Sequence, residues 1–160
     1  MDAENLKEEA LKRRKQWLAF YKKHKKELIK SDKQIHALHE LHTQQTNCLE
    51  CGNCCRMLGP RLLPADVEQL AKALKMKTPA FISQYIRTDE DGDMVFKSMP
   101  CPFLRADNYC AVYESRPKAC REYPHTDRRH FFQIFSLSVK NAETCPIVFH
   151  VLNDLTDQQN

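Results

Sequence analysis

The chain has 160 residues, of which 42 % are hydrophobic and 29 % are charged, and this suits one small domain with a moderate core. No stretch approaches the roughly 20 consecutive apolar residues that a transmembrane helix needs, so we expect no membrane span. The formal net charge is +4, and residues 1–33 hold 11 Lys or Arg against 6 Asp or Glu, so the basic excess lies in this segment.

Residues 3–30 contain no Gly or Pro and are rich in Lys, Glu, Leu and Ala, a composition typical of a helix. Apolar side chains recur along it at helical spacing, including Leu6, Ala10, Trp17 and Tyr21. The pattern favours a helix that packs through this stripe and exposes its lysines. The alternative is an arm for nucleic acid or an acidic membrane. We do not expect nucleic acid as a partner, because no base-reading motif accompanies the helix.

Ser31 and Asp32 predict the start of a second helix that runs to about Thr46. Its histidines, His36, His39 and His42, are three residues apart and drift around a helix, so they cannot easily meet at one ion. We expect them on the surface and outside the set of metal ligands. Residues 1–46 are therefore interpreted as a basic helical arm, and residues 47–160 as a separate cysteine-rich domain.

Turn and cap residues predict the elements of this second part. Residues 56–63 are expected to be extended around Gly59-Pro60, and Pro64 then opens a helix. Thr78-Pro79 starts another helix, and Asp91-Gly92 predicts a hairpin turn.

Near the end of the chain, the alternation of apolar residues over 131–139 predicts a strand, and residues 146–155 predict a closing helix. The fold class is α+β, mainly helical: a small single domain with irregular cysteine-rich metal-binding loops, preceded by the helical arm.

Eight cysteines carry the chemistry of the sequence. Four lie within eight residues, and four follow singly: Cys48, Cys51, Cys54, Cys55, Cys101, Cys110, Cys120 and Cys145. Two-residue spacing lets consecutive thiolates surround one centre. The N-terminal residues are charged and lack the apolar region of a signal peptide, so we expect a reducing, cytoplasmic compartment, where such cysteines are more often ligands than disulfides.

The cysteine run Cys48–Cys55 and the later segments around Cys101-Pro102, Cys110, Cys120 and Cys145-Pro146 together resemble the YkgJ-like CxxCxxCC cysteine-cluster family, described as a zinc- or iron-chelating domain. The resemblance covers roughly residues 48–146. It implies a small cytoplasmic bacterial protein in which all eight cysteines are metal ligands. A related cysteine cluster occurs in flagellin lysine methylases, which are larger proteins.

Nearby arginines fit this interpretation. Thiolates bound to a divalent metal leave excess negative charge, which Arg56, Arg105, Arg116 and Arg121 could offset by donating to sulfur. For Arg116 and Arg121 the alternative is an ordinary pair with a neighbouring glutamate. A histidine, His125 or His130, could replace one cysteine, because both follow Cys120 closely.

The metal remains open at this point. Zinc suits two closed four-thiolate sites without catalysis. An iron–sulfur cluster is the competitor, since Cys48, Cys51 and Cys54 match part of a ferredoxin motif, although the usual fourth cysteine is absent. Mononuclear iron on four thiolates is a third option. We expect a non-catalytic metal-binding protein acting in structure, metal handling or interaction. The alternative is an iron–sulfur redox or modifying enzyme related to the flagellin lysine methylases.

Overall fold

A computed structural model describes residues 3–158. The fold is α+β and mainly helical, with one small antiparallel sheet among the described residues, as predicted. The chain divides into two compact units. The first unit combines the described residues up to Cys51 with those from Pro124 onward, and the second unit is Gly52–Tyr123. None of the described helices is both long and apolar enough to span a membrane.

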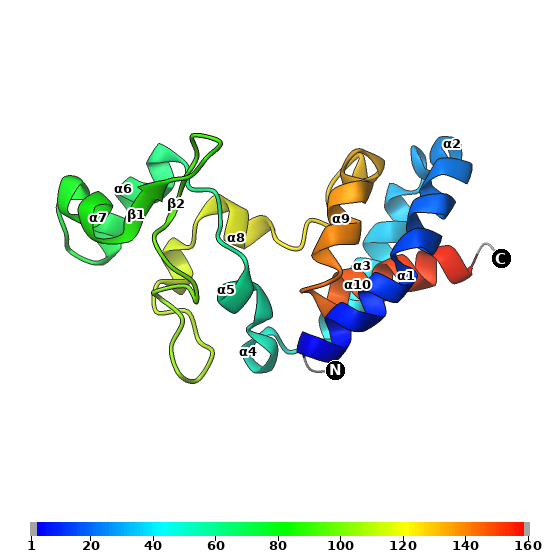
Figure 1. Ribbon diagram of the computed structural model, residues 1–160, viewed down its shortest axis with the longest axis horizontal. Coiled ribbons are helices and arrows are strands. Elements are labelled where there is room, and N and C mark those ends of the chain that lie inside the picture. The colour runs from blue at the N-terminus through cyan, green and yellow to red at the C-terminus, as the bar shows by residue number, and fades with distance from the viewer. Residues whose placement is uncertain (1–2, 159–160) are drawn as a thin grey trace. The chain divides into compact units, whose positions relative to one another are not determined.

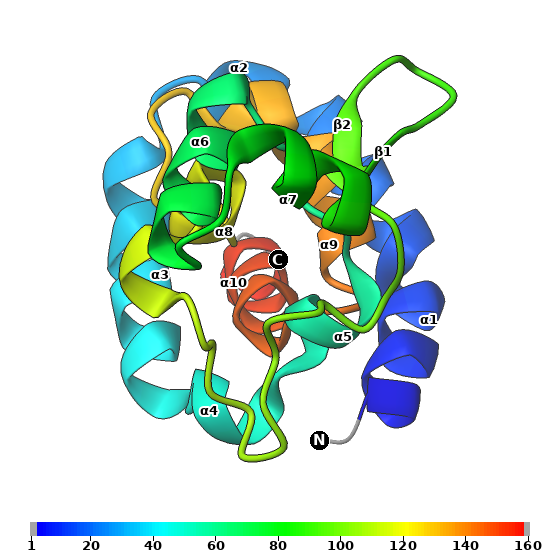
Figure 2. The same cartoon turned by 90° about the vertical axis from the view of Figure 1, so that its left-hand side faces the viewer.

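The first unit is built around its last helix. Its elements are α1 (Ala3–Lys23), α2 (Lys25–Leu28), α3 (Asp32–Gln45), α4 (Cys48–Cys51), the 3-10 helix η2 (Phe131–Ile134), α9 (Phe135–Asn141) and α10 (Pro146–Asp157). Helix α10 packs against α1, α3 and α9 (Figure 1). Figure 2 looks along α10, with α3 on one side and α1 on the other. Apolar side chains of α10 are buried over most of its length, which makes it the core of this unit.

The N-terminal helix packs through the stripe that its sequence predicts. Leu6, Ala10 and Trp17 are buried, and the Trp17 ring meets Phe149 of α10 edge to face at 5.7 Å between ring centroids. Tyr21 stacks on Phe135 of α9 at 4.9 Å. The basic residues of α1 therefore lie on a helix whose apolar face is already covered by its own unit.

The strand predicted over residues 131–139 is wrong, because this segment forms η2 and α9. Phe131, Phe135 and Val139 are spaced by four residues, which places them on one helical face, and all three are buried. Leu137, which a strand would have placed on the same face, is 49 % exposed. A four-residue spacing satisfies both a period of two and the helical period, so the alternation was ambiguous.

The prediction that the histidines of α3 lie on the surface is wrong for His42. Its side chain is buried, and Nε2 lies 2.7 Å from Oδ2 of Asp154 on α10. His39 Nδ1 lies 2.7 Å from the hydroxyl of the buried Thr126, and His36 contacts the carbonyl of Arg128 at 3.1 Å. These residues hold α3 against α10 and against the segment that precedes η2.

The second unit contains α5 (Asn53–Met57), α6 (Pro64–Ala73), α7 (Thr78–Tyr85), β1 (Ile86–Thr88), β2 (Met94–Phe96), the 3-10 helix η1 (Tyr113–Ser115) and α8 (Lys118–Glu122). Strands β1 and β2 form the predicted hairpin, with Ile86 opposite Phe96. The helix that begins at Pro64 is confirmed. The extended segment predicted from residue 56 is wrong at its start, because Arg56 and Met57 end α5.

An apolar core holds the second unit together. It consists of buried side chains from α6, α7, the hairpin and the loops: Leu62, Val67, Leu70, Ala71, Phe81, Ile86, Phe96, Phe103 and Val112. Cys101 and Cys110 pack at its edge and are partly buried. The cysteine loops are thus attached to a core that is made of other residues.

Candidate metal centre

All eight cysteines lie in the described part of the chain, and none of them is in a disulfide. Three belong to the first unit: Cys48, Cys51 and Cys145. Five belong to the second unit: Cys54, Cys55, Cys101, Cys110 and Cys120. The candidate ligands therefore fall into two sets, each of which is described within its own unit.

Backbone hydrogen bonds bring the cysteines of the second unit together. The Cys101 amide donates to the Cys55 carbonyl at 2.8 Å, which ties α5 to the loop after β2. Leu104 forms an antiparallel bridge with Cys110, and the Ala111 amide donates to the Phe103 carbonyl at 2.8 Å. Cys101 and Cys110 consequently lie on the two arms of one short loop.

Cys120 comes from α8, whose first turn is fixed by a buried carboxylate. Asp66 is 4 % exposed, and its Oδ1 accepts the amide of Lys118 at 3.0 Å. Its Oδ2 accepts the amide of Leu63 at 2.9 Å, which caps the start of α6. An acidic residue in the first turn of a helix, as Asp66 is in α6, is favourable to the helix dipole and does not by itself indicate contacts with a distant segment. The second partner of Asp66 is 52 residues away and left no local signal.

Four thiols of the second unit influence each other electrostatically. Burial raises the pKa of Cys120 to about 12, and negative charge on Cys101, Cys55 and Cys110 adds to the increase. Burial likewise raises the pKa of Cys101 to about 11, with Cys55 and Cys110 contributing. The pKa of Cys110 is raised by burial and by Cys55. We refer to Cys55, Cys101, Cys110 and Cys120 as the four-thiol cluster.

Cys55 is the member of this cluster that ionises most readily. A hydrogen bond from Cys54 lowers the pKa of Cys55 to about 7, and the positive charges of Arg56 and Arg116 act in the same direction against burial. At neutral pH a large share of Cys55 is thus thiolate, the form that binds metal. Cys54 lies beside it in α5, and its own role as a ligand stays a prediction.

The arginines near the cluster are held by local contacts. The Arg116 guanidinium lies 3.6 Å from the centre of the Tyr113 ring, and its Nε donates to the Tyr113 carbonyl at 2.9 Å. Arg56 donates to the side-chain carbonyl of Asn108, and Arg121 donates to the carbonyl of Arg116. The positive charges of Arg56 and Arg116 lower the pKa of Cys55, and donation to sulfur by the four arginines stays a prediction.

The cysteines of the first unit form a smaller set. Cys145 precedes the first turn of α10 and is 7 % exposed. Burial raises the pKa of Cys145 to about 11, negative charge on Cys48 and Cys51 adds to this, and the amides of Val148 and Ile147 oppose it. We refer to Cys48, Cys51 and Cys145 as the three-thiol set.

The donors fit a soft metal ion, but they are not closed around one. Thiolates select zinc, copper(I) and iron–sulfur centres. The described residues contain no group of three or more His, Cys, Asp or Glu side chains already arranged to hold a metal ion. Metal binding would therefore have to draw these thiols closer together and displace their protons.

The predicted histidine substitutes lie in the first unit, with His125 and His130 both in left-handed backbone conformations. The His130 amide donates to Asp32 Oδ2 at 2.6 Å, and its ring meets Phe132 edge to face. A role as metal ligand for either histidine stays a prediction.

Comparison with known proteins gives one result. Residues 47–146 match the model of the CxxCxxCC family, which is described as "Putative zinc- or iron-chelating domain". No curated protein and no solved structure matches the chain. The matched segment contains all eight cysteines and covers more than half of the sequence.

Proposed function

Because the chain belongs to the CxxCxxCC family of zinc- or iron-chelating domains, we propose that it is a non-catalytic metal-handling protein that carries zinc or iron on cysteine thiolates. The four-thiol cluster is the principal site in this proposal. The observation that carries it is that separate segments bring these cysteines together: the Cys101 amide donates to the Cys55 carbonyl, and Leu104 pairs with Cys110. The influence of these thiols on the pKa of Cys120 agrees with this arrangement. Four thiolates are a donor set that zinc and iron both accept.

The electrostatics support a site that is ready for a cation. Most of these thiols are protonated at neutral pH, because burial and the neighbouring sulfurs raise their pKa values. A divalent cation would remove that repulsion and release protons as it binds. Cys55, with its low pKa, supplies the first thiolate.

The three-thiol set supports a second, separate site. Cys145 is buried at the start of α10, and Cys48 and Cys51 come from α4. The alternative function is that of an iron–sulfur redox or modifying enzyme. The three-thiol set suits it better than the four-thiol cluster does, because a four-iron cluster held by three thiolates has one iron open to a substrate. Acid-labile sulfide separates this alternative from zinc.

A cytoplasmic, reducing location belongs to the same proposal. Cysteines bind metal only as thiolates, and an oxidising compartment would convert exposed pairs to disulfides. Cys48 is exposed and the cysteines of the four-thiol cluster are half-buried, so they are accessible to oxidants. A bacterial origin is implied by the family resemblance alone.

The test is to purify the protein without oxygen and to measure zinc, iron, acid-labile sulfide and the visible spectrum on one sample. We expect metal without sulfide, and we expect Cys120→Ser to lose the metal of the four-thiol cluster. The matched control is Met57→Ser, which removes an exposed sulfur from α5 without removing a thiol. Full metal content in Cys120→Ser would contradict the proposal, and iron with matching sulfide would favour the redox alternative.

A further inference from the structure

A surface of exposed lysines and arginines lies at one end of the first unit, where α1 and α2 end and α3 begins. It consists of residues 22–33 and 127–130, which meet through Asp32: its Oδ2 accepts the His130 amide at 2.6 Å, and its Oδ1 accepts the Phe131 amide at 3.0 Å. Figure 2 shows α2 beside the segment that leads into α9. We refer to residues 22–33 and 127–130 as the basic surface. Its exposed cations are Lys22, Lys23, Lys25, Lys26, Lys30, Lys33, Arg128 and Arg129.

The basic surface carries more positive charge than the chain as a whole. Eight Lys or Arg stand against three acids, Glu27, Asp32 and Asp127, which gives a formal net charge of +5, whereas that of the chain is +4. The rest of the protein is therefore close to neutral. Long-range attraction of an anionic partner is consequently concentrated at this surface.

The cations of the basic surface differ from those in the first part of α1. There, Lys12, Arg13 and Arg14 form ion pairs with acids of their own unit, at distances of 2.6–3.8 Å. Across residues 3–158, no lysine or arginine of the basic surface forms an ion pair. Lys33 even lies in the first turn of α3, where a cation opposes the helix dipole. Stabilisation of the fold thus does not account for this concentration of charge.

Two features of the basic surface favour lipid over nucleic acid as the anionic partner. Ile29 lies among the lysines and is 47 % exposed. An apolar side chain can enter the headgroup region of a membrane, but it adds nothing to a contact with the phosphates of nucleic acid. The aromatic rings at this end of α1 are already stacked, Tyr21 on Phe135 and His24 on Phe20, so they do not offer a platform for bases.

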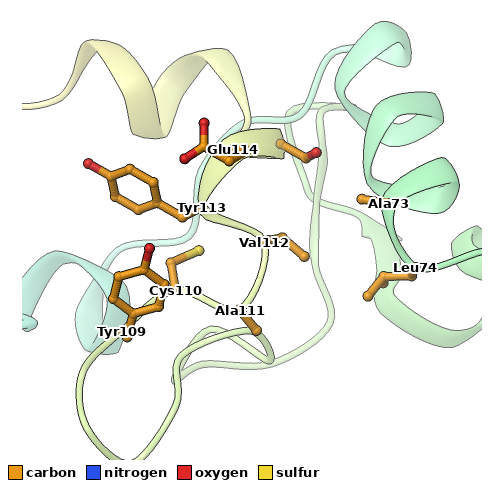
Figure 3. A pocket seen from close by; sticks show the side chains of 9 residues that line it. Ala73, Leu74, Tyr109, Cys110, Ala111, Val112, Tyr113 and Glu114 are labelled. Atoms are coloured by element: carbon orange, nitrogen blue, oxygen red, sulfur yellow. The ribbon is translucent and has the colours of Figure 1, made fainter.

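The pocket of the second unit gives an anionic partner no comparable site. Its volume is about 260 Å³, and its walls are the end of α6 and the segment 109–115 (Figure 3). Glu114 is the charged side chain of this lining, and no Lys or Arg is among the described residues that form it. Negative charge on a ligand is therefore disfavoured in the pocket and favoured at the basic surface.

We propose that the basic surface docks the protein on a membrane that contains anionic lipids, with its lysines and arginines against the lipid phosphates and Ile29 among the headgroups. The docking is peripheral, because the apolar face of α1 is buried in its own unit and cannot enter the bilayer. The cytoplasmic leaflet is negatively charged and attracts clusters of four to eight Lys or Arg. The proposal is independent of the proposed metal site.

The test is co-sedimentation of the full chain with vesicles of phosphatidylcholine that contain about one-third phosphatidylglycerol. We expect binding that weakens as salt is added, and no binding to vesicles of phosphatidylcholine alone. Lys30→Glu combined with Lys33→Glu should lower the partition coefficient about thirtyfold or more, because each lysine near such a surface contributes about fivefold. This variant should stay folded, since an acid in the first turn of α3 favours the helix. Circular dichroism and metal content check this.

The matched control reverses two exposed lysines of the second unit, Lys72→Glu with Lys77→Glu, and should bind the vesicles within about twofold of the unsubstituted protein. Ile29→Ser should weaken vesicle binding about fivefold. Its control is Ile82→Ser, at an exposed isoleucine of α7, which should have no effect.

Three outcomes would overturn the proposal. One is equal binding to the neutral and the anionic vesicles. Another is an equal loss of binding in the two doubly substituted proteins. The third is binding to a duplex oligonucleotide, abolished by Lys30→Glu with Lys33→Glu, together with no binding to the anionic vesicles, since this would assign the basic surface to nucleic acid.

Discussion

Asp66→Asn should weaken both the second unit and its metal site, although Asp66 is not a thiol and binds no metal in our proposal. The two oxygens of its carboxylate accept two different amides, those of Leu63 and Lys118. An asparagine has one acceptor oxygen, and its NH₂ group would face the other amide, so one hydrogen bond is lost. A hydrogen bond to a charged group contributes about 1.5–3 kcal/mol, and a buried donor left without a partner costs a similar amount. We therefore expect the free energy of unfolding to fall by about 1.5–3 kcal/mol.

Asp89→Asn is the matched control for this change. Asp89 also accepts two backbone amides, those of Asp91 at 3.0 Å and Asp93 at 2.9 Å, but both donate to the same oxygen, Oδ1. An asparagine can keep both bonds through its single carbonyl oxygen. We expect Asp89→Asn to cost only about 0.5–1 kcal/mol, the difference between a charged and a neutral acceptor.

Urea denaturation of the metal-free proteins measures the stabilities, and competition with a zinc chelator measures the affinities. Zinc affinity should fall in Asp66→Asn, because the hydrogen bond to the amide of Lys118 is either lost or no longer made to a charged acceptor, and this amide begins the helix that carries Cys120. It should stay unchanged in Asp89→Asn. Equal losses of stability in the two variants would show that Asp66→Asn does not lose a hydrogen bond that Asp89→Asn keeps. A destabilised Asp66→Asn with normal zinc affinity would refute the positioning of Cys120.

Two further predictions concern a glycine and a histidine. Gly52→Ala should lower the free energy of unfolding by about 2 kcal/mol. About 1 kcal/mol comes from the backbone, where φ is +58°, and the rest arises because the new Cβ would displace the Arg56 guanidinium, 2.6 Å away, from its hydrogen bond with Asn108. Gly92→Ala, at φ +83° with nothing within 4 Å, should cost only about 1 kcal/mol, and equal losses in urea titrations would exclude the contribution of Arg56. Burial and the charge of His42 lower the pKa of His150, and the negative charge of Asp154 opposes this shift. The contribution of His150 to stability is therefore complete above the unfolded pKa of about 6.5, and it is lost as the pH falls from that value toward the lower pKa of the folded state. His150→Gln should flatten this loss in thermal melts between pH 7 and 5, and parallel pH profiles would contradict the prediction.

The sequence predicted those features of the fold that depend on neighbouring residues. Pro64 and Asp91-Gly92 indicate a helix start and a turn through their own backbone preferences, and the structure confirms both. The prediction of a strand over residues 131–139 was wrong because the spacing of its apolar residues fits two periods, and packing against α1 and α10 selects the helix. The predicted division near residue 46 stays a prediction. That α3 packs against α10 depends on contacts such as His42 with Asp154, which are 112 residues apart.

The same limit applies to the metal site. The sequence pattern identified the cysteines of the run Cys48–Cys55 through their two-residue intervals, and it identified Cys101, Cys110, Cys120 and Cys145 as ligands only through the family resemblance. It could not divide them into sets, because Cys55 meets Cys101 through a backbone hydrogen bond across 46 residues of chain. Nor could it find the role of Asp66, whose partner Lys118 lies 52 residues further along the chain.

The position of the thiols relative to the core favours a carried metal over a purely structural one. In small domains whose fold depends on zinc, the metal takes the place of a hydrophobic core. In the second unit, side chains such as Leu70, Phe81 and Phe103 form that core, and Cys101 and Cys110 lie at its edge. Removal of metal would therefore leave the apolar contacts of α6, α7 and the hairpin intact. A site at the edge of a core made of other residues can gain and lose its metal while the unit stays folded.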